Sequence, residues 1–385
     1  MKKVFVGMSG GVDSSISAAL LKKAGFDVTG VFIKVWLPET DITEGMREFK
    51  CTWREDRLDA MRVAAVLEIK FVTLDLETEY KKHVVDYMIA EYKAGRTPNP
   101  DVMCNKYVKF GGFFDWAMKQ GADYVATGHY AKVVATQIQL AEKTDGAKKN
   151  NVPPVYNLVA GDDTNKDQSY FLWTLTQEQL SKTLFPVGNI EKPEVRKLAH
   201  KFALPTADKK DSQGLCFIGK IDIKDFLSHY IVAKKGNVLD TAGKIIGTHD
   251  GAFFFTVGER HGFTINNADK TPTDLPYYVI SKDVVVNTVT VSQHIAEENK
   301  QSTITLHEVN WTQGFAPQQH IKSGHNFLAR PRYRAPLTPV AISAIDTCAR
   351  TCIVNFKTPQ HTLSAGQSLV IYDGTTCLGG GIISF

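Results

Sequence analysis

The chain has 385 residues, and a single hydrophobic core seldom grows to that size, so two or three domains are expected. Hydrophobic residues make up 43% and charged residues 22%, with 29 Gly and 15 Pro, which excludes collagen-like, coiled-coil and wholly disordered proteins. The 45 Lys and Arg against 41 Asp and Glu leave a net charge of only +4. Any nucleic-acid surface must therefore be a local patch.

The N-terminal stretch and the cysteines indicate a protein of the cytoplasm. The N-terminal sequence MKKVFVGMSGG has too short an apolar stretch for a secretion signal or a membrane span. No other apolar stretch approaches the length of a membrane span. Six cysteines in a chain of this length favour a reducing compartment over a disulfide framework. We therefore expect a cytoplasmic protein without a membrane partner, in which any disulfide would be catalytic.

The first half of the chain alternates β-branched runs with amphipathic segments, which is typical of βαβ units around a parallel sheet. Strands are predicted at 3–6, 28–36, 71–74 and 124–127, and helices at 14–24, 57–67, 79–94 and 110–119. This pattern predicts a doubly wound α/β domain. Its ligand should lie beyond the carboxyl ends of the strands.

The middle of the chain is polar and basic. Residues 135–154 are lysine-rich and carry no clear period, which predicts an exposed loop. A helical period returns over 177–202. Residues 192–235 hold ten Lys and Arg against five Asp and Glu, a local excess of five positive charges. That excess is larger than the net charge of the whole chain.

From about residue 221 the chain consists of short β-rich runs separated by Gly and Asn. Strands are expected at 237–239, 244–248, 253–256, 277–281, 288–291, 303–306, 327–330, 341–345, 351–356, 368–372 and 379–383. Short strands with turn signals predict small β domains, the last of them a barrel. We expect an α/β domain over 1–220, a β-rich central domain over 221–295 and a C-terminal β-barrel over 296–385.

A glycine-rich loop follows the first predicted strand and opens a helix, with the sequence Gly7-Met8-Ser9-Gly10-Gly11-Val12-Asp13-Ser14-Ser15. Backbone N–H groups at such a turn, with the helix dipole, make a site for phosphate oxygens. The serine hydroxyls can add donors, and Asp13 can hold Mg²⁺ or cap the helix. The alternative interpretation is a turn followed by a helix cap. The loop lacks the Lys of a Walker motif and the spacing of a dinucleotide fingerprint.

The run SGGVDSS resembles the signature of the PP-loop pyrophosphatases, which have an adenine nucleotide alpha hydrolase-like fold. That resemblance implies ATP binding and cleavage between the α and β phosphates, with transfer of AMP to a substrate oxygen. AMP is then displaced by a nucleophile. The motif alone leaves amidation, ligation and thiolation open.

Two cysteines bear on the choice of nucleophile. Cys104 lies in a predicted loop after Pro98 and Pro100 and just before Lys106, a setting that favours a thiolate. Cys216 lies between glycines at 214 and 219. Taken singly, each cysteine also fits a small core residue.

Taken together, these features resemble the tRNA 2-thiouridylases, a branch of the PP-loop proteins. The resemblance covers essentially the whole chain, in the blocks 7–15, 97–110, 126–131, 166–173, 211–219, 332–336 and 365–383. It implies ATP-dependent 2-thiolation of the wobble uridine of tRNA. The implied partners are the anticodon loop of tRNA and a sulfur donor, either a cysteine desulfurase or a relay carrier. We expect a monomer.

The resemblance also assigns residues. ATP, with Mg²⁺ and Asp13 as its candidate ligand, would bind Gly7, Met8, Ser9, Gly10, Gly11, Val12, Asp13 and Ser14, with the adenine near Ile33 and Gly128. Cys216 would carry a persulfide sulfur. Cys104 would attack to release that sulfur and end in a disulfide with Cys216. Asp101 would serve as acid or base. No structural metal is implied.

The implied RNA contacts lie in several blocks. Asn99, Pro100 and Asp101 would meet the target base, and the other tRNA contacts would be His129, Lys166, Asp167, Gln168, Arg332, Tyr333 and Gln367. Independently, the basic run 330–334 contains Tyr333, and no acidic residue lies between Glu308 and Asp346. Arg pairs with phosphates and Tyr can stack on an unpaired base. The alternative for this run is a solvated strand edge.

Sulfur transfer needs two thiols that approach within bonding distance. Because Gly214 and Gly219 flank Cys216, we expect the segment 205–219 to rearrange between states.

Two other functions are alternatives to thiolation. A PP-loop amidotransferase or ligase would not need Cys104 and Cys216, and a non-catalytic RNA-binding protein would not need Ser9 and Asp13. Cys348 and Cys352 lack a second pair of zinc-ligand spacing, and the CxxC pairs of an iron–sulfur thiolase are absent.

Overall fold

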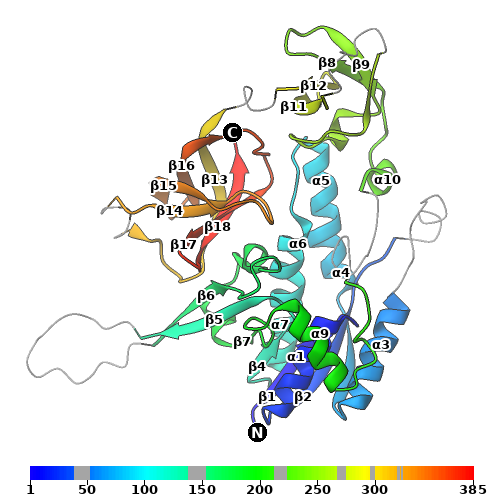
Figure 1. Ribbon diagram of the computed structural model, residues 1–385, viewed down its shortest axis with the longest axis vertical. Coiled ribbons are helices and arrows are strands. Elements are labelled where there is room, and N and C mark those ends of the chain that lie inside the picture. The colour runs from blue at the N-terminus through cyan, green and yellow to red at the C-terminus, as the bar shows by residue number, and fades with distance from the viewer. Residues whose placement is uncertain are drawn as a thin grey trace, which may run out of the picture.

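The computed structural model describes residues 1–38, 53–137, 153–211, 223–266, 275–294, 300–318, 321 and 324–385. The described elements form three groups (Figure 1): a helix-covered sheet near the N-terminus, a small sheet at the top of the view and a barrel at the left. The predicted fold class is confirmed, with a doubly wound parallel sheet followed by two β-rich parts. The boundaries expected near 220 and 295 lie outside the described residues and stay predictions.

The N-terminal sheet is parallel, with the strand order β3-β2-β1-β4-β7. Its strands are β1 (Lys3–Gly7), β2 (Asp27–Lys34), β3 (Lys70–Asp75), β4 (Tyr124–Ala126) and β7 (Thr183–Leu184). The first four match predicted strands. The helical period at 177–202 is interrupted by β7, so that it forms two helices, α8 (Gln177–Ser181) and α9 (Lys192–Lys201).

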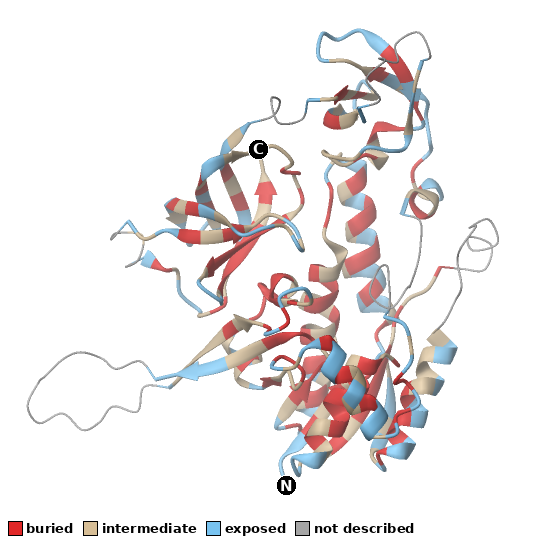
Figure 2. Cartoon of the chain, in the orientation of Figure 1, coloured by how far each residue is buried: buried red, intermediate tan, exposed pale blue. Residues whose placement is uncertain are grey.

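Helices cover both faces of this sheet. One face packs against α9, α1 (Val12–Lys23) and α3 (Trp53–Val66) through a single apolar cluster. The other face packs against a helical layer composed of α4 (Glu77–Tyr80), the π-helical η1 (Lys81–Asp86), α5 (Tyr87–Lys93), the π-helical η2 (Cys104–Phe113) and α7 (Phe114–Lys119). Figure 2 shows buried residues along these contacts.

The helix expected at 110–119 begins ten residues earlier, at α6 (Pro100–Met103), and runs on through η2. Its start has a local cause. The side chain of Asn99 accepts a hydrogen bond from the Val102 N–H at 3.3 Å, and Pro100 occupies the first turn. Both features favour a helix N-terminus. Cys104 therefore lies in a helix, and its prediction as a loop residue is wrong.

A hairpin of the N-terminal part joins the barrel. Strands β5 (Ala131–Thr136) and β6 (Val155–Ala160) pair with each other, and β6 pairs with β18 (Thr376–Ser384). Neither hairpin strand was predicted, and the first two residues of the loop expected at 135–154 belong to β5. Residues 138–152 lie outside the described part. The short 3-10 helix η3 (Ser169–Leu172) follows the hairpin.

The central sheet has the order β10-β9-β8-β12-β11. Its elements are α10 (Ile223–Ser228), β8 (Gly236–Leu239), β9 (Ile245–His249), β10 (Phe263–Ile265), β11 (Tyr278–Asp283) and β12 (Thr288–Ser292). The strand expected at 253–256 is wrong. That segment is a 3-10 helix, η4 (Ala252–Phe254), because Gly251 has a φ of 151° and the Asn287 side chain accepts from the Ala252 N–H at 2.9 Å.

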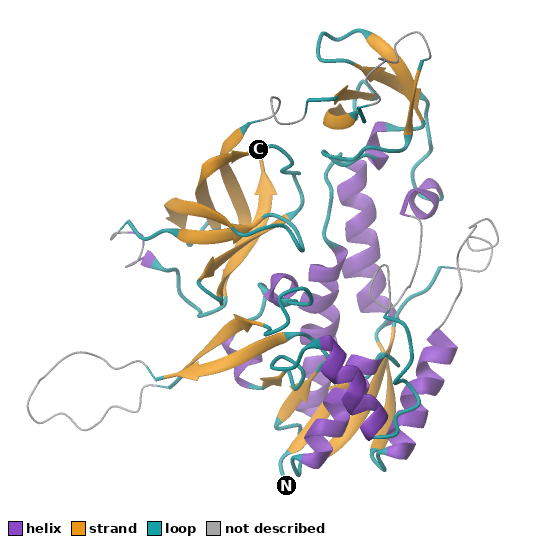
Figure 3. Ribbon diagram, in the orientation of Figure 1, coloured by secondary structure: helices purple, strands orange, loops and turns teal. Residues whose placement is uncertain are grey.

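The C-terminal strands form a closed barrel, since β13 pairs with both β16 and β18. Its strands are β13 (Gln301–Trp311), β14 (Phe327–Arg330), β15 (Thr338–Asp346), β16 (Thr351–Gln360), β17 (Ser368–Asp373) and β18. Figure 3 shows the all-strand barrel beside the mixed N-terminal layer. The predicted barrel is confirmed.

A buried ion pair joins the barrel to the N-terminal part. Arg330 on β14 donates to the Asp167 carboxylate at 3.1 Å, and their side chains are only 15% and 5% exposed. Asp167 also accepts from the backbone N–H groups of Gly161 and Ser169. Its charge is therefore satisfied inside the protein.

We expect Arg330→Met to lower the free energy of unfolding by about 3 kcal/mol, because it leaves the buried Asp167 carboxylate without its cation. Urea unfolding followed by circular dichroism measures the change. The control is Lys81→Met, which removes an ion pair with Asp86 whose side chains are both 50% exposed. That control should cost less than about 1 kcal/mol. Equal losses for the two variants would contradict this interpretation.

Candidate functional site

The phosphate loop joins the end of β1 to the start of α1. Gly10 has a φ of 74°, and a Cβ at this position would lie 2.2 Å from the backbone oxygen of Asp56 in α3. Only glycine fits there without displacing α3. Met8 donates its N–H to the Val31 carbonyl at 2.8 Å, which extends the contact of the loop with β2. The loop therefore has a defined shape beside the helix N-terminus.

The serine hydroxyls of the loop have different surroundings. Ser14 accepts from the Ser9 N–H at 3.2 Å and donates to the Gly11 carbonyl at 3.1 Å. Ser15 donates to the same carbonyl at 2.8 Å. Ser14 and Ser15 are buried, whereas Ser9 is exposed. In this structure Ser14 and Ser15 hold the loop together, and Ser9 lies where a phosphate could reach it.

The two residues expected near the adenine lie at the same edge of the sheet. Val31 is the register partner of Gly7, so Ile33 lies two residues beyond the end of β1. Ile33 is buried among core side chains. Gly128 follows β4, and a Cβ there would lie 2.7 Å from the Ser14 nitrogen. Gly128 thus allows the chain to pass directly against the first turn of α1.

Asp13 is surrounded by partners that the sequence did not reveal. Lys192 donates to its two carboxylate oxygens at 2.7 and 2.8 Å, and the Tyr130 hydroxyl donates to Oδ1 at 2.7 Å. Burial and the Asp13 charge raise the pKa of Tyr130 well above its usual range, so this hydroxyl keeps its proton. The N-cap of α1 is Gly11, without a side-chain cap bond. The cap expected from Asp13 is therefore not formed.

Lys192 could have been found from one signal. It is the first residue of α9, followed by Pro193, and a lysine is unfavourable at a helix N-terminus because of the helix dipole. An unfavourable cation at that position indicates a specific acidic partner.

Cys104 is fully buried at the junction of α6 and η2, within the core cluster that contains Ile33. The nearby cation, Lys106, has its ammonium 3.5 Å from the Glu308 carboxylate and 4.9 Å from the ring of Tyr107. The structure thus places Cys104 in the core, in agreement with its interpretation as a small core residue, and its role as a thiolate stays a prediction. Cys216 lies outside the described residues, and so does most of the segment 205–219.

The loop before α6 is held by the barrel. The Gln367 amide donates to the carbonyls of Thr97 and Pro98, both at 3.0 Å, and Thr97 donates its N–H to Ala365 at 2.8 Å. Asn99, Pro100 and Asp101 follow directly and are half-buried. Gln367 was expected to contact tRNA, but here it binds the loop that leads to Cys104.

His129 is buried beside the phosphate loop. Its Nδ1 lies 2.7 Å from the Thr127 hydroxyl, and its Nε2 lies 3.4 Å from the Lys109 ammonium. Burial, followed by the Lys109 charge, holds the pKa of His129 well below its usual range. The ring is therefore neutral. Because an ammonium donates to Nε2, the proton belongs on Nδ1, which donates to Thr127.

The remaining expected tRNA contacts divide into two groups. Lys166 pairs with Asp211 at 2.6 Å, Asp167 with Arg330, and the Gln168 side chain accepts from the Tyr130 N–H at 3.0 Å. These three side chains hold parts of the protein together. By contrast, Arg332 is exposed and Tyr333 is half-buried, with its ring 4.5 Å from that of Phe171.

A hollow of about 420 Å³ lies between the loop after β6 and the loop after β14. Its lining is basic and contains one aromatic ring, with the residues Thr164, Asn165, Lys166, Asp167, Arg330, Tyr333 and Arg334. The Tyr333 ring and the Arg334 guanidinium are 5.2 Å apart. Such a surface suits a nucleotide, since it offers stacking together with positive charge.

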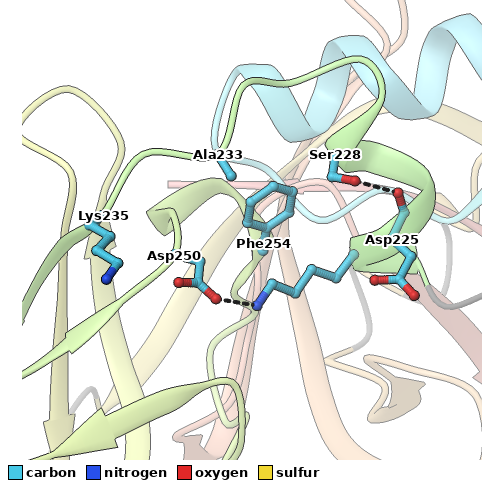
Figure 4. A pocket seen from close by; sticks show the side chains of 7 residues that line it. Asp225, Ser228, Ala233, Lys235, Asp250 and Phe254 are labelled. Atoms are coloured by element: carbon cyan, nitrogen blue, oxygen red, sulfur yellow. Dashed lines mark hydrogen bonds and ion pairs between the residues drawn. The ribbon is translucent and has the colours of Figure 1, made fainter. Parts of the chain in front are cut away.

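A second hollow, of about 290 Å³, lies between α10 and the central sheet (Figure 4). Lys224 pairs with Asp250 at 2.8 Å in this hollow, which Phe254 also lines, and Ser228 donates to the Asp225 carbonyl. The charges in this hollow partly compensate each other. We assign it no role.

The described residues contain neither a metal-binding cluster nor a membrane-spanning helix. No group of three or more His, Cys, Asp or Glu side chains in this part of the chain is arranged to hold a metal ion. No helix among the described elements is both long and apolar enough to span a bilayer.

Three protein-family models match consecutive parts of the chain. They are described as the tRNA methyl transferase HUP domain over residues 2–220, the tRNA methyl transferase PRC-barrel domain over 224–293 and the Aminomethyltransferase beta-barrel domain over 301–383.

Curated relatives are similar over almost the whole chain. The tRNA-specific 2-thiouridylase MnmA of Enterococcus faecalis is 45% identical over 382 residues, which cover 99% of this chain and 95% of that protein. MnmA of Streptococcus thermophilus is 43% identical, with coverage of 99% and 95%. MnmA of Nitrosomonas eutropha is 42% identical, with coverage of 99% and 98%. With this identity along its entire length, the chain belongs to the tRNA-specific 2-thiouridylase family.

Proposed function

We propose that this protein is a tRNA sulfurtransferase that uses ATP to place sulfur on C2 of the wobble uridine. The observation that carries the proposal is the position of the helix that contains Cys104. Its Phe113 ring lies 3.5 Å from where a Cβ on Gly7 would be, and its Lys109 contacts His129, next to Gly128. The phosphate loop and the Cys104 helix therefore share one edge of the sheet, where ligands of open α/β sheets bind.

The names of the relatives, tRNA-specific 2-thiouridylase, support tRNA as the substrate and 2-thiouridine as the product. The match of a HUP domain to residues 2–220 supports nucleotide binding. The surface around Tyr333 supports an RNA partner, because it combines an aromatic ring with arginines.

The first step would activate the base. The C2 oxygen of uridine attacks the α-phosphorus of ATP, pyrophosphate leaves, and C2 then carries AMP as a leaving group. The loop 7–14 and the N-terminus of α1 would bind the phosphate oxygens, and Mg²⁺ would arrive with ATP. Asn99 and Pro100 would position the target base, with Asp101 as its acid or base.

The second step would deliver sulfur. A donor protein loads Cys216 as a persulfide. Attack of the Cys104 thiolate on the Sγ of Cys216 forms the Cys104–Cys216 disulfide and releases the outer sulfur as sulfide, which displaces AMP from C2. A thiol reductant then restores both cysteines. Because Cys104 is buried, this step requires its covering side chains to move aside.

The RNA would bind across the N-terminal domain and the barrel. Arg332 and Tyr333 are the candidate direct contacts, and Lys166, which lines the same hollow as Tyr333, would join them by exchanging its ion pair with Asp211 for an RNA phosphate. His129, Asp167, Gln168 and Gln367 would act mainly by holding the loops that border the site, since each bonds to protein groups in the structure. We further propose three domains with boundaries near 220 and 295, a monomeric state and a cytoplasmic location.

We expect Cys104→Ser and Cys216→Ser to abolish 2-thiouridine formation while tRNA-dependent exchange of pyrophosphate into ATP continues. Asp13→Ala should reduce both reactions, because adenylation precedes sulfur transfer. Nucleoside mass spectrometry and labelled pyrophosphate measure the two steps. The control is Cys348→Ser, which changes an exposed cysteine of the barrel and should leave both reactions intact.

The same experiment separates the alternatives. If both serine variants still formed 2-thiouridine, the proposed route of sulfur through Cys104 and Cys216 would be contradicted. If the wild-type protein exchanged no pyrophosphate into ATP with any uridine-bearing tRNA, the proposed enzymatic activity would be contradicted.

We expect Arg332→Ala and Tyr333→Ala to weaken tRNA binding about tenfold, since each removes a contact worth roughly 1–3 kcal/mol, and to leave the affinity for ATP unchanged. For Arg332→Ala the dependence of log Kd on log salt should also fall by about one. Filter binding at several salt concentrations measures these effects. Lys357→Ala, at an exposed position on β16, is the control. An equal effect of all three variants would point to bulk charge instead of a defined surface.

A further inference from the structure

Lys192 is a buried lysine for which the sequence motifs suggest no role. It is 8% exposed, and its ammonium binds both carboxylate oxygens of Asp13 and, at 2.8 Å, Oδ1 of Asp211. Its backbone N–H donates to the Asp163 carboxylate at 3.0 Å. Lys192 is thus held from both its backbone and its side chain.

The two carboxylates that share this ammonium come from distant parts of the chain. Asp13 belongs to the phosphate loop and the first turn of α1. Asp211 is the last described residue before the segment that contains Cys216. Asp211 also binds Lys166 and Arg196, at 2.6 and 2.9 Å. Lys192 is therefore the one residue of this cluster that bonds to both aspartates through the contacts described.

The charges of the cluster depend on one another. Burial raises the pKa of Asp211, but Lys166 and Lys192 outweigh that effect and bring this pKa to about 2. The carboxylate of Asp211 is therefore ionised. Without the Lys192 ammonium, two carboxylates would face each other across a partly buried site, and they would repel.

A purely stabilising role explains Lys192 poorly. Burying an ammonium costs free energy that well-packed apolar side chains would avoid, and the first turn of α9 is unfavourable for a cation. Because the Lys192 ammonium lies next to the phosphate loop, a role in function explains why this cost in free energy is accepted.

We propose that Lys192 is a positioning residue of the nucleotide site, which orients the Asp13 carboxylate at the phosphate loop and ties it to Asp211. The inference rests on the proposed function, because it takes the loop 7–14 as the site of ATP. Because Lys192 acts through Asp13, loss of its side chain should weaken the binding of ATP and leave the binding of RNA unchanged.

The test compares Lys192→Met, which keeps the length of the side chain, with Lys192→Arg, which keeps its charge. Calorimetry measures the Kd of ATP, and pyrophosphate exchange measures KM for ATP and kcat. We expect Lys192→Met to raise the Kd and KM of ATP about ten- to a hundredfold, as for loss of a hydrogen bond to a charged group. The Kd of tRNA should not change, and Lys192→Arg should recover most of the loss.

Lys197→Met is the matched control, since this lysine of α9 has a side chain that is 75% exposed. It should behave like the wild type. Wild-type affinity for ATP in a folded Lys192→Met protein would overturn the inference and leave the proposed function standing. Absence of exchange in the wild type would instead overturn the proposed function.

If Lys192→Met does not fold, Asp211→Asn tests the same link. It removes one of the two carboxylates that Lys192 joins, and we expect it to raise the Kd of ATP about fivefold. An unchanged Kd in that variant would overturn the inference.

Discussion

The close approach of backbone segments around the first turn of α1 is the constraint on which the site depends. Gly10 passes against α3 with a positive φ, and Gly128 passes against the nitrogen of Ser14. A side chain at either position would collide with the backbone of a neighbouring segment. Because both positions are glycines, the phosphate loop, the start of α1 and the segment after β4 can meet at one edge of the parallel sheet. The serine hydroxyls then complete the loop from within.

The helix that contains Cys104, which begins at Pro100, links this edge to the rest of the molecule. Its N-terminus follows the loop that Gln367 of the barrel binds, and the Thr97 hydroxyl lies 3.2 Å from that of Thr256 in the central part. The barrel and the central part thus both contact Thr97, two residues before Asn99. The buried pair of Asp167 and Arg330 and the pairing of β6 with β18 fix the barrel in place. An RNA that binds the barrel would therefore influence the position of the Cys104 thiol.

Charge in this protein is used largely inside the molecule. The basic segment 192–235 has a local excess of positive charge, yet its Lys192, Arg196 and Lys209 bind aspartates, two of which come from α3. Their charge therefore connects helices instead of meeting solvent. Two exposed arginines, Arg332 and Arg334, flank Tyr333 in a stretch of the barrel without acidic residues. Local counts of Lys and Arg overestimate a binding surface when carboxylates from elsewhere in the chain fold against them.

The sequence by itself determined the elements whose signals are local. The glycine-rich turn, the alternation of strands and helices and the short strands of the barrel were predicted, because backbone conformation and hydrophobic period follow from neighbouring residues. The cap at Asn99 was equally local but was overlooked, so Cys104 was taken for a loop residue. Only the tertiary structure decided the burial of Cys104, the binding of the 97–98 loop by Gln367 and the union of Asp13 with Asp211 through Lys192. Each depends on contacts between residues far apart in sequence, which no local pattern specifies.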